Sequence, residues 1–362
     1  MVERIHGFFQ RPISFLCKKL SPRQFLIFSS ILVGMTSGLA AVLLKYCVHK
    51  LGSQVSFYST TYNEFFLFAL FPLLGILLTV VFTRYFLKRD VQKGSAEIAY
   101  AITKRSSVIP KEEMYAHVIS AGLTVGFGGS VGLESPMVST GAAIGSNYGT
   151  AYKLSYKDRT ILLASGAAAG IAAAFNAPIA GVLFAVEVLL ADVSASAFIP
   201  LIISAASGAL LSKIILEEGV ILSFSLQQPF NYHNLPYYIA LGILAGLVSF
   251  FYSRAFSWMD HTMSLVKNQW SRVIIGGMLL FVLIFIFPPL YGEGYDTITA
   301  LATLNPERLT QTSVLNSLIQ TEGHLLLFLG ALIFLKTIAT SITLSSGGNG
   351  GNFGPSLFVG AY

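Results

Sequence analysis

Charged residues are scarce in this 362-residue sequence: Asp, Glu, Lys and Arg make up 11% of it, whereas soluble domains have roughly 25%. Hydrophobic residues make up 54%, so an ordinary soluble domain is excluded and a polytopic membrane protein is indicated. The two cysteines, Cys17 and Cys47, can form neither a disulfide framework nor a CxxC site. Because HExxH motifs, aspartate pairs in the apolar segments and histidine clusters are lacking, no enzyme, metal or cofactor site is predicted.

The basic residues lie in short clusters between apolar runs, which is typical of membrane proteins and not of a nucleic-acid-binding surface. Residues 1–23 interleave basic and aromatic side chains, which predicts an amphipathic helix on the cytoplasmic membrane surface. The first two spans are expected at 22–50 and 64–87, joined by an external loop at 52–63, and a basic cluster follows at 84–93. The pattern predicts a multi-pass protein of the plasma or inner membrane with a cytoplasmic N-terminus.

The next apolar segments, such as 114–127 and 136–149, are shorter than the roughly 20 residues that cross a bilayer. Glycine-interrupted segments of this kind indicate broken helices around an interior site. Between them lies 126–136 (GFGGSVGLESP), in which Ser135 as cap and Pro136 at the first helical position predict a helix start. Its backbone N–H groups would attract an anion. Glu134 is then a tethered anion that competes with a free one or, alternatively, only complements the helix dipole.

A duplication is indicated by matches at two nearly equal offsets. With an offset of 212 residues, the first span matches a segment that begins near Tyr237. With an offset of 219 residues, Gly128, Gly132 and Pro136 match later Gly and Pro residues. The first span starts inside, whereas its partner follows a stretch without Lys or Arg and starts outside, so the repeat is inverted. We predict membrane repeats at 24–216 and 235–362. Their two glycine-rich loops, at 128–136 and 347–355, are expected to meet near the midplane of the membrane.

These motifs resemble the CLC family of chloride channels and chloride/proton antiporters. The resemblance covers nearly the whole chain and is strongest at 132–136 (GLESP), 351–355 (GNFGP) and 164–181 (ASGAAAGIAAAFNAPIAG). It implies an all-α, inverted-repeat membrane fold with broken helices around a midplane anion site, and a homodimer with one pore per subunit. It also implies a gating glutamate at Glu134 and anion contacts from the N–H groups of Asn352 and Phe353.

Three departures from the family pattern bear on function. In the family, a serine of the first loop supplies its hydroxyl to the anion. Ungapped matching places Lys93 at this serine position, where it either contacts the anion or is only the last residue of the basic cluster. Ser95 could supply the hydroxyl after a small shift of the alignment. The internal glutamate of the antiporters falls on Val188, so strict coupling by that route is doubtful, and Glu187 is either part of a proton path or a structural group. By the repeat, about 70 further residues would complete the second half.

The sequence therefore predicts transport of chloride or a similar small anion across the bilayer, channel-like or weakly proton-coupled and gated by Glu134. The alternative is a chloride/proton or fluoride/proton antiporter with another proton route. A cation transporter is disfavoured, because helix N-termini and not carbonyl oxygens would line the site. A scaffold role would apply if no complete pore forms.

Overall fold

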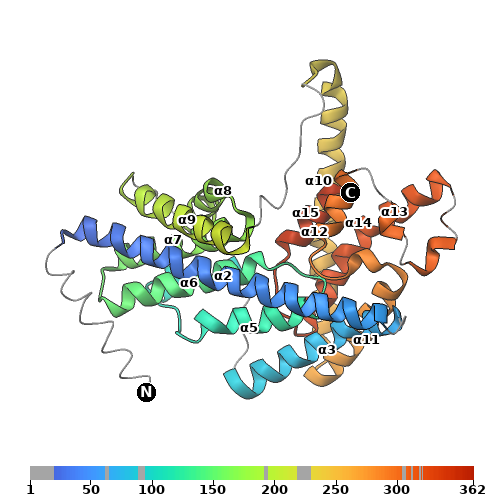
Figure 1. Ribbon diagram of the computed structural model, residues 1–362, viewed down its shortest axis with the longest axis horizontal. Coiled ribbons are helices and arrows are strands. Elements are labelled where there is room, and N and C mark those ends of the chain that lie inside the picture. The colour runs from blue at the N-terminus through green and yellow to red at the C-terminus, as the bar shows by residue number, and fades with distance from the viewer. Residues whose placement is uncertain are drawn as a thin grey trace. The chain divides into compact units, whose positions relative to one another are not determined.

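A computed structural model describes residues 20–61, 65–88, 94–190, 195–217, 230–303, 307–310, 313–317, 319 and 321–362. These residues form helices joined by short turns, and the single β-bridge among them joins two glycines (Figure 1). The helices of the first half are α2 (Pro22–Thr61), α3 (Phe65–Val81), η1 (Phe82–Leu87), α4 (Ser95–Lys104), α5 (Glu113–Gly126), α6 (Glu134–Ala151), α7 (Tyr156–Phe175), α8 (Pro178–Phe184), η2 (Ala185–Leu189) and α9 (Ala195–Leu216).

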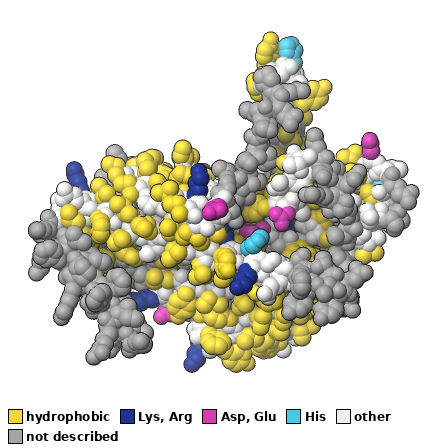
Figure 2. Space-filling model, viewed as in Figure 1, with side chains coloured by type: hydrophobic (Ala, Val, Ile, Leu, Met, Phe, Trp, Pro, Cys, Tyr) yellow, Lys and Arg dark blue, Asp and Glu magenta, His cyan; other side chains and the backbone are white. Residues whose placement is uncertain are grey.

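The helices of the second half are η3 (Tyr232–Asn234), α10 (Leu235–Ser264), α11 (Gln269–Ile286), η4 (Pro288–Leu290), α12 (Tyr295–Ala302), α13 (Glu307–Thr310), η5 (Val314–Ser317), α14 (Glu322–Ser345) and α15 (Phe353–Ala361). Among the described residues, seven helices are long and apolar enough to cross a membrane by length and composition: α2, α3 with η1, α7, α9, α10 with η3, α11 and α14. Figure 2 shows hydrophobic side chains over much of the visible surface, with charged ones scattered among them. This is the surface expected for contact with lipid.

The chain divides into two compact units. The first unit combines Met1–Val42, Ser95–Tyr115 and Met137–Gly219, and the second combines Leu43–Gly94, Ala116–Pro136 and Val220–Tyr362. Each unit therefore gathers segments that are distant in sequence. The expected repeats at 24–216 and 235–362 describe a different, sequential division, which stays a prediction.

In the first unit, small residues allow helices to pack backbone against backbone. Gly141 on α6 faces Gly166 on α7, and a Cβ atom on either glycine would collide with the carbonyl group of the other. Such close approach is how membrane helices associate when their surroundings are as apolar as themselves. The expected break after α7 is present: Asn176 has a left-handed conformation (φ 54°), and α8 starts with Pro178.

The second unit has its own apolar core, formed where α3, α11, α14 and α15 meet. Ile76, Leu280, Leu332 and Phe358 are fully buried there, and Figure 1 shows α3 beside α11. Helices α14 and α15, which flank the second glycine-rich loop, both contribute to this core.

Several predicted boundaries change in the structure. Most of the expected amphipathic segment 1–23 lies outside the described residues. Helix α2 continues to Thr61, through most of the expected loop at 52–63. Helix α6 begins at Glu134, so the prediction of Ser135 as its cap is wrong. Because Glu134 lies in the first turn of α6, its side chain starts beside the unpaired N–H groups of a helix N-terminus.

Candidate anion and gate site

The two glycine-rich loops meet through a pair of backbone hydrogen bonds. The N–H group of Gly132 donates to the carbonyl of Gly351, and the N–H group of Gly351 donates to the carbonyl of Gly132, each at 2.8 Å. These two glycines are equivalent under the 219-residue offset, and they form the isolated antiparallel bridge. The bridge brings the N-termini of α6 and α15 together in one place.

The contacts on both sides of this bridge are reciprocal. The N–H group of Asn349 donates to Thr124 Oγ1 at 2.9 Å, and the N–H group of Ser130 donates to Thr343 Oγ1 at 3.3 Å. Thr124 and Thr343 are equivalent under the same offset, as are Ser130 and Asn349. Reciprocal contacts of this kind are what an inverted repeat predicts.

Glycine is required at the turns because their backbone lies in the left-handed region. Gly128 has φ +90° and its equivalent Gly347 has φ +110°, values that only glycine adopts without strain. A Cβ atom on Gly128 would also collide with the ring of Tyr291. The sequence pattern of glycines therefore reflects backbone geometry at both loops.

The carboxylate of Glu134 crosses from α6 to the N-terminus of α15. Glu134 is 3% exposed, and its Oε2 accepts a hydrogen bond from the N–H group of Gly354 at 3.3 Å. Its Oε1 accepts a hydrogen bond from the Tyr295 hydroxyl. A Cβ atom on Gly132 would collide with Oε2. The carboxylate thus lies where the helix dipole and an unpaired amide favour negative charge.

A second carboxylate lies beside the first. Glu293 Oε1 accepts a hydrogen bond from the N–H group of Leu133 at 3.1 Å, one residue before Glu134. Glu293 belongs to the turn between α11 and α12, outside the seven long apolar helices. Burial of the group, together with the negative charge of Glu134, raises the pKa of the Glu293 carboxyl to about 8.

A buried lysine fixes the turn that carries Glu293. Lys336 on α14 is fully buried, and its Nζ donates to the carbonyl of Gly292 at 2.8 Å and to that of Leu290 at 3.4 Å. The N–H group of Gly292 in turn donates to the carbonyl of Gly128 at 3.0 Å. The turn is therefore held between α14 and the first glycine-rich loop.

The structure describes the other predicted site residues to different extents. Asn352 immediately precedes α15, Phe353 is its first residue, and both side chains are exposed. Ser95 begins α4 but its side chain is outside the description, as is the whole of Lys93. Gly94, next to Ser95, lies close to Ser135: a Cβ on it would be 4.0 Å from Ser135 Oγ. The contact roles of these residues stay predictions.

Glu187 lies in η2, in the first compact unit, and its side chain is exposed, like that of Val188. Glu134 belongs to the second unit. Among the described residues no hydrogen bond is found for the Glu187 carboxylate. Its role in a proton path or as a structural group stays a prediction.

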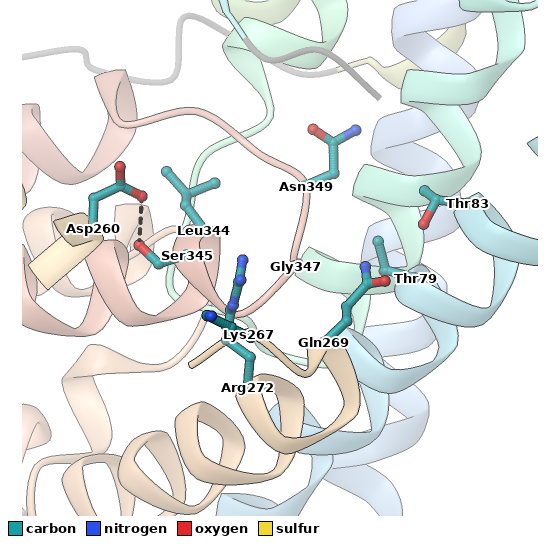
Figure 3. A pocket seen from close by; sticks show the side chains of 10 residues that line it. All are labelled: Thr79, Thr83, Asp260, Lys267, Gln269, Arg272, Leu344, Ser345, Gly347 and Asn349. Carbon is teal, nitrogen blue, oxygen red and sulfur yellow. Dashed lines mark hydrogen bonds between the residues drawn. The ribbon is translucent and has the colours of Figure 1, made fainter. Parts of the chain in front are cut away.

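A pocket of about 410 Å³ opens against the second glycine-rich loop (Figure 3). Asp260 accepts a hydrogen bond from Ser345 at 3.0 Å on one side of it, and Thr79 and Thr83 lie on the opposite side. Its other lining residues are Lys267, Gln269, Arg272, Leu344, Gly347 and Asn349. The two basic side chains outnumber the single acid, so the pocket favours anions.

One feature of the first loop also fits an enzyme motif: residues 128–132 match G-x-S-x-G, with Ser130 at the nucleophile position. Ser130 is fully buried, and its Oγ has no hydrogen-bond partner among the described residues. A serine nucleophile needs an adjacent base. The glycines of this motif are accounted for by the turn, in which Gly128 has a positive φ.

Sequence reasoning missed Tyr295, Glu293 and Lys336. Lys336 could have been found, because a lone lysine within an apolar span is a candidate functional residue. Glu293 and Tyr295 could not, because their turn is distant in sequence from Glu134 and only the fold brings them together.

The fold and this site define a polytopic membrane protein in which two repeated helix N-termini face each other around a buried carboxylate. The family model described as voltage gated chloride channel matches residues 74–362. The chain belongs to this family, known as CLC.

The relatives agree with this assignment. A putative chloride channel protein ClcB-like of Ralstonia nicotianae is 27% identical over 344 residues, which are 91% of this chain and 75% of that protein. The chloride channel protein CLC-e of Arabidopsis thaliana is 27% identical over 361 residues, 92% of this chain and 48% of that protein. The chain thus spans three quarters of the first relative and about half of the second.

Solved structures share the fold. A slow cyanobacterial Cl⁻/H⁺ antiporter superposes with a TM-score of 0.76 at 22% identity, covering 94% of this chain and 77% of that one. A CLC-type fluoride/proton antiporter gives 0.73 at 24% identity, covering 93% and 79%. The predicted all-α, CLC-like membrane fold is therefore confirmed.

Proposed function

We propose that this protein transports chloride or a similar small anion and that Glu134 is its gate. The observation that carries the proposal is the hydrogen bond from the Gly354 N–H group to the Glu134 carboxylate. A group that binds a carboxylate through a backbone amide at a helix N-terminus also binds a free anion. Membership of the CLC family supports the same activity.

In this mechanism the anion loses its hydration water and binds instead to backbone N–H groups at the N-terminus of α15, including those of Asn352 and Phe353. The Glu134 carboxylate occupies the same helix terminus and blocks it. When Glu134 takes up a proton, it no longer competes for the dipole, and the anion takes its place. Acid pH is therefore expected to open the path.

The test is chloride efflux from liposomes at several pH values, for the protein and its Glu134→Gln variant. Glutamine has the same shape as the protonated carboxyl and cannot ionise, so efflux by the variant should be high and independent of pH. If the variant retains the full pH dependence, Glu134 is not the gate. If neither protein carries anions, the proposed function is wrong.

Channel and antiporter activity are distinguished by proton movement. Val188 stands where CLC antiporters carry an internal glutamate, which favours a channel or a weakly coupled exchanger. Uphill proton movement driven by a chloride gradient would establish antiport by another route. The structural likeness to a fluoride/proton antiporter makes fluoride the second anion to test in the same assay.

The proposed orientation in the membrane follows from the basic residues. The basic clusters indicate a protein of the plasma or inner membrane whose N-terminus lies in the cytoplasm.

The proposed assembly is a homodimer. Exposed apolar side chains on α8 (Ile179 and Leu183) and on α9 (Ile202 and Leu210) would pack against a second copy. Cross-linking of cysteines introduced on α8 in membranes tests the homodimer: no linked pair would argue against it.

A further inference from the structure

The candidate gate contains two carboxylates where the anion site needs only one. Glu293 accepts a hydrogen bond from the Leu133 N–H group at 3.1 Å, and Glu134 is the residue that follows Leu133 in the chain. The position of Glu293 is fixed, because Lys336 and Gly128 both hold its turn through hydrogen bonds to Gly292. The proximity of the two acids is therefore a property of the fold.

Two carboxylates in such surroundings do not both ionise readily, because like charges repel strongly away from water. The other groups that act on the pair are Tyr295 on α12, Lys45 on α2 and Lys336 on α14. Tyr295 donates its hydroxyl to Glu134. The ammonium group of Lys336 is directed to backbone carbonyls, and no ion pair joins it to Glu293 in the described part of the chain. Lys336 thus acts on Glu293 as a nearby charge and not as an ion-pair partner.

Resting on the proposed function, we propose that Glu293 is a second proton-binding group of the gate, and that the two carboxylates hold one proton between them near neutral pH. The proton passes from a Glu293 oxygen to a Glu134 oxygen, leaving Glu293 as the carboxylate and Glu134 neutral. The Gly354 N–H group is then available to the anion. Glu293 thereby extends the pH range over which the path opens, because a proton is already stored beside the gate.

The experiment measures chloride efflux between pH 4 and 9 for the protein in liposomes and for Glu293→Gln. We expect efflux of the variant at pH 7 to fall about tenfold, and the pH of half-maximal efflux to move down by about one unit, since one pH unit corresponds to a tenfold change in proton binding. Asp296→Asn, at an exposed acid three residues further along the chain in α12, is the matched control and should leave the profile unchanged. Glu293→Asp should retain a broad profile, because it keeps a second acid.

Infrared spectroscopy of the protein in membranes tests the stored proton without transport. A protonated carboxyl C=O band that shifts in D₂O should be present at pH 7 in the wild type and absent in Glu293→Gln. An unchanged band, or an unchanged pH profile in a folded Glu293→Gln protein, overturns the inference while leaving Glu134 as the gate. Absence of anion efflux in the wild type would instead refute the proposed function, and the infrared band would still decide the proton pair.

Discussion

Gly132 and Gly351 donate backbone hydrogen bonds to each other at 2.8 Å, although 219 residues separate them. The two residues are equivalent positions of the predicted repeat, and their bridge joins its two glycine-rich loops directly. The proposed gate depends on this contact, because the contact places the side chain of Glu134 at the start of α15.

Gly132→Ala should displace the gate. The added methyl group would collide with Glu134 Oε2 and would lie 3.2 Å from the backbone nitrogen of Gly354, so the flexible carboxylate must leave its amide. We expect chloride efflux at pH 7 to rise several-fold, toward that of Glu134→Gln. Gly330→Ala is the control, because a Cβ there meets no atom within 4 Å. Equal efflux by the two alanine variants would contradict this prediction.

Tyr295→Phe should open the path at higher pH. The hydroxyl stabilises the ionised, blocking form of Glu134 by donating to it, and a hydrogen bond to a charged group contributes about 1.5–3 kcal/mol. Its loss should raise the pH of half-maximal efflux by about one to two units. Tyr291→Phe is the matched control, since the Tyr291 hydroxyl has no partner in the described residues. A downward shift, or the same shift in both variants, would refute the assignment.

Lys336→Met should destabilise the protein and loosen the gate turn. It removes the donor to the carbonyls of Gly292 and Leu290, and an unsatisfied buried polar group costs about 1–3 kcal/mol. We expect a lower melting temperature in detergent and a changed pH profile of efflux. Lys213→Met, at an exposed lysine of α9, serves as the control. A melting temperature equal to that of the control would show that the turn does not need Lys336.

Lys267→Glu should slow anion entry from the pocket of Figure 3. Reversing an exposed charge at the entrance weakens the attraction for anions, and this effect is screened at high salt. We expect efflux to fall about two- to fivefold at low ionic strength, with a smaller effect at high ionic strength. Lys213→Glu controls for the change in net charge. A loss of efflux that does not depend on salt would indicate a structural effect instead.

The sequence predicts the fold well because its signals are local. Low charge and long apolar runs indicate membrane helices, and the glycine-rich stretches indicate the broken ones; the family and the all-α fold are confirmed. The start of α6 is misplaced because Ser135 and Pro136 resemble a cap and a first helical residue, while the helix already begins at Glu134.

The site was predicted only in part, for a physical reason. Glu134 and the α15 loop carry recognisable patterns, whereas Glu293 and Tyr295 act through tertiary contacts that no spacing in the sequence reveals. Glu293 lies in the turn before α12 and Tyr295 is the first residue of α12; this turn is held at the gate by the hydrogen bonds that Gly292 makes with Lys336 and Gly128. The anion-contact roles of Ser95, Lys93, Asn352 and Phe353 stay predictions.

The symmetric bridge has an asymmetric consequence. The two loops that it joins have matching backbone, but their side chains differ in charge at one equivalent position. The first loop has the acidic side chain of Glu134 there, and the second has the aromatic ring of Phe353. In the proposed gate, protonation therefore changes the charge contributed by the first half and leaves the contribution of the second half unchanged. If Glu134 is the gate, a backbone present in two copies responds to pH through only one of them.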